Sequence, residues 1–141
     1  MKALLLTPSA DFGEFMQVVD EDVNDLQTCY KLLGCELIDI VHRRCYTSKD
    51  DFFEFDVICD DEGLFKESNL PVLALDWVDH TPDKEFIVGK VLICGRADDE
   101  GYQTSLDPAT ALAITSLSHV KQLSVSKTLC LSFPACADCF K

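Results

Sequence analysis

The sequence is poor in basic residues and contains no long apolar run. It has 12 lysines and arginines against 25 aspartates and glutamates, a formal net charge of −13 at pH 7. A field of that sign repels phosphate backbones, so we expect no direct binding of nucleic acid. No apolar stretch approaches the ~20 residues that a membrane-spanning helix needs, so we expect no membrane partner.

The chain also lacks the patterns of familiar catalytic and metal sites. No serine lies in a nucleophile-elbow pattern, and no glycine-rich loop is of the kind that cradles phosphate. His42, His80 and His119 are isolated from one another along the chain. The pair Cys136-x-x-Cys139 supplies half of a zinc site, and no second pair has the matching spacing. We therefore predict no catalytic residue, no metal site and no cofactor.

Cysteine, by contrast, is abundant, with eight in 141 residues. The spacings are irregular, and several cysteines sit within apolar patterns, as small buried hydrophobic residues do. The apolar start resembles the beginning of a signal peptide, but Asp11 and Glu14 follow it at once. We therefore expect a cytoplasmic protein with reduced thiols rather than a disulfide framework.

Length and composition predict one small domain with its own core. At 141 residues and 48% hydrophobic content, the chain can bury roughly two thirds of its unfolded surface. The predicted fold class is α+β, with a mixed, mainly antiparallel sheet and two helices. We assign residues 1–117 to a single domain and residues 118–141 to a C-terminal strand and tail.

Hydrophobic periodicity places the two helices. From Asp22 to Leu33, apolar residues recur at i, i+3, i+4 and i+7, with Asp22 as a candidate N-cap and Gly34 as the C-terminal stop. The second helix is predicted from Pro108 to Leu117, because proline suits a first helical turn.

Alternating or continuous apolar runs place the strands. The segment from Leu70 to Trp77 is predicted as a short helix or an irregular connector. Gly89 inside 86–95, the strongest predicted central strand, suggests a bulge or close packing. The predicted strands are 2–7, 14–20, 37–47, 53–57 and 86–95, with further strand from 119 onward.

Two acidic turns echo each other, Asp60-Asp61-Glu62-Gly63 and Asp98-Asp99-Glu100-Gly101. Their oxygens suit a hard cation, but the alternating ligand pattern of an EF-hand loop is missing. Aspartate and glycine are common in turns because they accept a positive φ. We interpret both segments as structural turns.

A local basic spot stands out in this acidic chain. Arg43, Arg44 and Tyr46 lie together on a predicted strand, and their positive charge adjoins His42. Such residues can bind an anionic or planar ligand, and Trp77 can offer its ring as a surface against which the ligand packs. The alternative for Arg43 and Arg44 is that their exposed charge discourages pairing at a sheet edge. The alternative for Trp77 is that it anchors the core or a protein partner.

Four stretches of sequence share motifs with a known family: Leu33–Val41, Val57–Leu64, Asn69–Pro71 and Ile87–Gly95. They resemble a small domain family of unknown function that is spread among phages, plasmids and Firmicutes genomes. The similarity extends over about residues 1 to 115. It implies a mobile-element origin and an accessory role, transfers no activity, and adds Asn69 to the candidate ligand residues.

We therefore expect a non-enzymatic accessory protein of a phage or mobile element that binds and blocks a host protein, for example in host defence. Its acidic surface would engage a basic partner by charge complementarity. One alternative is a homo-oligomeric sponge that sequesters a nucleotide-like signalling molecule, and another is a cysteine-dependent enzyme. The candidate ligand residues for the sponge are Arg43, Arg44, Tyr46, Asn69 and Trp77.

Overall fold

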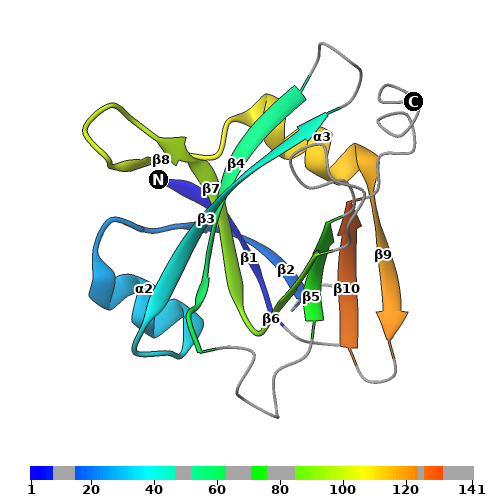
Figure 1. Ribbon diagram of the computed structural model, residues 1–141, viewed down its shortest axis with the longest axis horizontal. Coiled ribbons are helices and arrows are strands. Elements are labelled where there is room, and N and C mark those ends of the chain that lie inside the picture. The colour runs from blue at the N-terminus through cyan, green and yellow to red at the C-terminus, as the bar shows by residue number, and fades with distance from the viewer. Residues whose placement is uncertain (8–14, 47–51, 63–70, 76–84, 124–125, 132–141) are drawn as a thin grey trace.

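The described part of the chain forms two β-sheets and two helices (Figure 1). The computed structural model describes residues 1–7, 15–46, 52–62, 71–75, 85–123 and 126–131. None of the helices in these ranges is long and apolar enough to cross a membrane. The elements are β1 (Lys2–Leu6), β2 (Met16–Asp20), α2 (Leu26–Leu33), β3 (Ile38–Tyr46), β4 (Phe52–Asp60), β5 (Pro71–Leu75), β6 (Glu85–Val88), β7 (Val91–Ala97), β8 (Gln103–Thr104), α3 (Pro108–Leu117), β9 (Ser118–Leu123) and β10 (Ser126–Leu131).

The larger sheet has the strand order β2-β1-β7-β4-β3, with β8 paired to β7, and its described pairs are antiparallel. The smaller sheet has the order β6-β5-β10-β9, in which β10 and β5 are parallel. The predicted α+β class with a mainly antiparallel sheet is therefore confirmed. The division of the strands into two sheets was not predicted.

Both faces of the larger sheet are covered, so its central strands are apolar on both sides. In β7, every residue from Val91 to Gly95 is buried. One face packs against α2, and its buried residues include Ala3, Leu5, Ile58 and Leu92. The opposite face packs against α3, and its buried residues include Leu4, Leu6, Val57, Ile93 and Ile114.

Helix α2 begins four residues later than predicted. Its N-cap is Asp25, whose carboxylate accepts from the backbone N–H of Gln27. Asp22 instead accepts from the N–H of Asn24 in the turn before the helix, so the prediction of Asp22 as the cap was wrong. Gly34 ends the helix at φ 64°, as predicted, and α3 has the predicted bounds.

Two strand predictions were wrong because pairing with distant strands outweighed the local pattern. The run from Phe86 to Gly95 is two strands, since the chain turns at Gly89 (φ 77°) and passes from β6 in the smaller sheet to β7 in the larger one. The segment Pro71–Leu75 is a strand rather than a short helix or connector, because β6 and β10 pair with it on either side.

Candidate functional site

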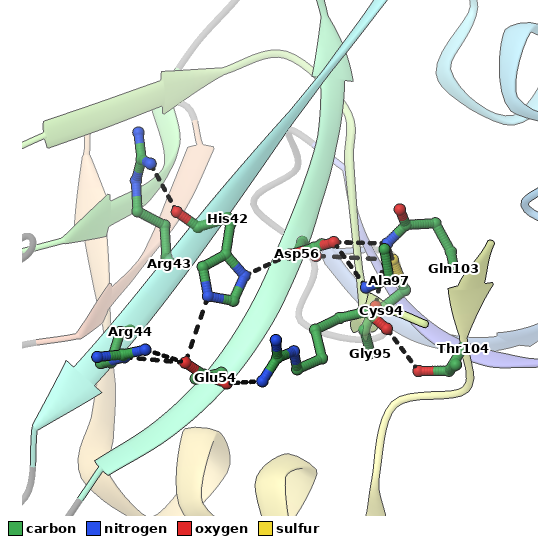
Figure 2. A network of polar contacts seen from close by, with 11 residues as sticks. His42, Arg43, Arg44, Glu54, Asp56, Cys94, Gly95, Ala97, Gln103 and Thr104 are labelled. Atoms are coloured by element: carbon green, nitrogen blue, oxygen red, sulfur yellow. Dashed lines mark hydrogen bonds and ion pairs between the residues drawn. The ribbon is translucent and has the colours of Figure 1, made fainter. Parts of the chain in front are cut away.

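A network of charged side chains crosses β3, β4, β7 and β8 on the face that carries α2 (Figure 2). The β3–β4 register sets His42 opposite Asp56 and Arg44 opposite Glu54. Residues directly opposite each other in an antiparallel pair project to the same face, so these side chains meet. Strand β7 then brings Arg96 to the other side of Glu54.

Asp56 is the most deeply placed charge of the network. Its Oδ1 lies 2.7 Å from His42 Nδ1, and its Oδ2 accepts from Gln103 Nε2 at 2.7 Å and from the Ala97 backbone N–H at 3.2 Å. Because an ionised carboxylate only accepts, His42 Nδ1 is the donor of its bond. Three hydrogen-bond donors therefore offset the free-energy cost of burying the charged carboxylate of Asp56.

Glu54 is also nearly buried and is held by two arginines. Its Oε1 accepts from Arg44 Nη2 at 2.7 Å and Nε at 2.9 Å, and its Oε2 accepts from Arg96 Nη1 at 2.8 Å. His42 Nε2 lies 3.5 Å from Oε1. Burial alone would raise the pKa of Glu54, but the hydrogen bonds from Arg44 and the positive charges of Arg96, Arg44 and His42 outweigh it and lower that pKa.

The setting of His42 differs from the one its sequence neighbours suggested. The imidazole lies between the carboxylates of Glu54 and Asp56, and Arg44 binds the same Glu54 oxygen that His42 faces. Side chains alternate across a strand, so Arg43 points to the opposite face of β3 from His42. The structure therefore adds two carboxylates to the cations that the sequence places beside His42.

The network has the parts of a general acid–base pair, but the thiols near it are poorly suited to nucleophilic attack. Burial raises the pKa of the Cys94 thiol to about 12 and also raises the pKa of Cys29. A thiol must ionise to attack, and these two stay protonated at neutral pH. In the described part of the chain, no group of three or more histidine, cysteine, aspartate or glutamate side chains is placed to hold a metal ion.

The predicted ligand residues are only partly placed by the structure. Arg44 lies 4.4 Å above the Phe52 ring and pairs with Glu54, while Arg43 Nη1 donates to the backbone carbonyl of His42 at 2.8 Å. As consecutive residues of β3 they project from opposite faces. The Tyr46 side chain and the whole of Asn69 and Trp77 lie outside the described residues, so a pocket shared by all five stays a prediction.

Sequence reasoning missed Glu54, Asp56, Arg96 and Gln103. The alternation of Phe53-Glu54-Phe55-Asp56-Val57 predicted a wet face for both carboxylates, whereas neighbouring strands cover them. The only sequence-level indication was two acidic residues two positions apart in a strand opposite His42 and Arg44. That indication becomes visible only once the β3–β4 register is known.

A second feature is a surface that we call the acidic edge, formed by residues 20–25, 60–62 and 98–100. These segments contain no lysine or arginine. They lie on the side of the molecule that carries α2 and the β7–β8 turn, away from the smaller sheet (Figure 1). Its ten carboxylates are Asp20, Glu21, Asp22, Asp25, Asp60, Asp61, Glu62, Asp98, Asp99 and Glu100.

The two acidic turns at this edge share one geometry, which supports their interpretation as structural turns. Asp60 Oδ1 accepts from the Glu62 N–H, and Asp98 Oδ1 accepts from the Glu100 N–H, both at 2.9 Å. An aspartate that accepts from the backbone two residues on forms an Asx turn. Each turn uses its first carboxylate to set the backbone and leaves the next two acidic residues exposed.

Comparison with protein-family models assigns the fold to a family. The model named DUF3846, a domain of unknown function, matches residues 1–119. The chain belongs to the DUF3846 family. No curated protein and no solved structure matches it. The predicted resemblance to a small family of unknown function is confirmed in this coarser form, and the DUF3846 match runs through α3 into the start of β9.

Proposed function

We propose that this DUF3846 protein is a non-enzymatic, cytoplasmic accessory protein of a phage or other mobile element that binds and blocks a basic host protein. The observation that supports the proposal is the acidic edge, where three separated segments place ten carboxylates on one side of the molecule (Figure 1). Of these, Asp20 is paired with Lys2 and the N-terminal amine. Such a surface attracts a positively charged partner over a distance and raises the rate of association.

The turn geometry presents this charge in a defined arrangement. Asp60 and Asp98 are committed to their own backbones, so Asp61, Glu62, Asp99 and Glu100 are the exposed carriers of charge. Asp98 Oδ1 also accepts from the Tyr102 N–H at 3.0 Å, which holds the second turn at both ends. A turn whose backbone is already fixed loses less conformational entropy on binding than a mobile loop.

The charges of the network are paired with one another inside the chain, so the proposal gives the network a structural role. Glu54 and Asp56 are compensated by Arg44, Arg96 and His42 within the chain. No buried side-chain nitrogen or oxygen of the described residues lacks a hydrogen-bond partner. In this proposal the network holds four strands in register, and the surface charge does the binding.

The test is capture of a partner from host lysate by immobilised protein at low and high salt. Wild type should retain a basic protein at low salt and release it at high salt, since the screening length falls from about 30 Å at 0.01 M to about 3 Å at 1 M. The variant D61N/E62Q/D99N/E100Q should lose that protein. The control D50N/D51N/D83N/D138N makes the same change in net charge at residues that are not part of the three acidic-edge segments and should keep it.

The proposal fails if the edge variant keeps the captured protein, or if the control variant loses it equally. The first result would remove the acidic edge as the binding surface. The second would show that total charge, rather than the arrangement at the edge, is responsible. Circular dichroism of both variants checks that neither loses its fold.

A further inference from the structure

The larger sheet ends at β3, and this edge carries an inference beyond the proposed function. Among the described strands, β3 pairs only with β4, along all nine residues from Ile38 to Tyr46. The opposite long side of β3 therefore faces no described strand. Such an edge is a template for another strand unless something covers it.

Two hydrogen bonds show which backbone groups of β3 point outward. The carbonyl of Leu37 accepts from the Asp61 N–H, so at this end of the hairpin the odd-numbered residues face β4. The carbonyl of His42 accepts from the guanidinium of Arg43 instead. Because alternate residues of an antiparallel strand face alternate sides, the N–H and C=O groups of Ile40 and His42 face the open edge.

The side chains along this edge are divided by charge. Asp39 lies near the start of β3, and Arg43 lies four residues further on the same face, with Val41 between them. A strand with an acid in its first half and a base in its second half is complementary to an antiparallel copy of itself. Paired in parallel, the same strand would set like charges side by side, which is destabilising.

We infer that a second copy of this chain pairs antiparallel with β3, on a two-fold axis through Val41. In that register Asp39 lies opposite Arg43 of the partner subunit, and the same ion pair repeats on the other side of the axis. Outward-facing backbone groups of Ile40 meet those of His42 of the partner subunit. The two larger sheets then form one continuous sheet.

The register satisfies the outward groups and covers apolar surface. Ile40 is 45% exposed in the single chain, and the new strand lies alongside it. The His42 carbonyl then accepts from the N–H of the partner subunit's Ile40 in place of the Arg43 guanidinium. The acidic edge lies on other segments, so a dimer of this kind would present two copies of it.

The experiment is sedimentation equilibrium on charge-swap variants of the full chain. Wild type should associate as a dimer at micromolar concentration. Asp39→Arg and Arg43→Asp should each weaken self-association at least about tenfold, because each replaces two attractions by two repulsions. An equimolar mixture of the two single variants should form a heterodimer, since every position at the edge then faces its opposite charge.

The control Asp99→Arg makes the same charge change as Asp39→Arg on the β7–β8 turn and should leave the dimer intact. The inference is overturned if wild type is monomeric, if the single variants remain dimeric, or if their mixture stays monomeric. A monomeric wild type would favour the opposite interpretation, in which Arg43 protects the edge from pairing. Far-ultraviolet circular dichroism of each variant excludes misfolding as the cause.

Discussion

Gln103 donates to the carboxylate of Asp56 at 2.7 Å across a separation of 47 residues. Its amide also donates to the Gly95 carbonyl at 3.0 Å, and its own backbone N–H donates to Asn24 at 2.8 Å. One residue of the two-residue strand β8 thus connects β4 and β7 through its side chain and the turn before α2 through its backbone. Both Gln103 and Asp56 are buried.

Gln103→Ala should lower the free energy of unfolding by about 2 kcal/mol, because it leaves a buried carboxylate and a buried carbonyl short of a donor. Urea denaturation followed by circular dichroism measures this difference. Thr104→Ala is the neighbouring control. It removes one exposed bond to the Arg96 carbonyl and should cost less than about 1 kcal/mol. Equal losses in the free energy of unfolding for Gln103→Ala and Thr104→Ala would contradict the structural importance of Gln103.

Glu54 should stabilise the fold at neutral pH and lose this effect as the pH becomes acidic. Its pKa in the folded chain lies below the ordinary value of 4.5. A group of this kind stabilises the fold above its unfolded pKa, and the contribution is lost as the pH falls through the folded pKa. Glu54→Gln should therefore be less stable than wild type at pH 7 and lose less stability on acidification below pH 4.5.

Thermal melts across pH 3 to 7 measure the Glu54 effect. Glu62→Gln on the exposed turn is the control and should preserve the wild-type dependence. If the melting temperature of Glu54→Gln falls with decreasing pH as steeply as that of wild type, other carboxylates dominate the loss of stability in this pH range.

Gly95→Ala should be strongly destabilising. A Cβ at this position would overlap the Ser105 carbonyl oxygen and the Thr104 hydroxyl, so β7 and β8 could not approach as they do. We expect a loss of about 3 kcal/mol or failure to fold. Gly101→Ala is the matched control, since open space surrounds that position and only its φ of 88° opposes a side chain, at a cost of about 1 kcal/mol. Similar losses would contradict the close packing at Gly95.

Cys94 should resist alkylation in the native protein. Its pKa of about 12 and its burial leave almost no accessible thiolate at pH 8. Iodoacetamide labelling followed by peptide mass spectrometry should show Cys59, which is only partly buried, reacting before Cys94. Both cysteines should label once the chain is unfolded in urea. Rapid native labelling of Cys94 would contradict its buried setting and revive the alternative of a cysteine-dependent enzyme.

Local patterns were enough to predict much of the framework. The apolar stripe and Gly34 of α2, the bounds of α3, the strands β1 to β4 and the two Asx turns all follow from interactions within a few residues of each other. Short-range hydrogen bonding and side-chain periodicity leave a clear mark in the order of residues. The net charge that underlies the acidic edge is likewise a property of composition.

Pairing between distant segments accounts for what the sequence did not reveal. The run 86–95 became strands in two different sheets, and Pro71–Leu75 became a strand, because their partners lie far along the chain. The charged network arose in the same way. His42 meets Asp56, and Asp56 meets Gln103, only because strand register sets them together. Hydrophobic burial selects that register over the whole sheet, and no local pattern encodes it.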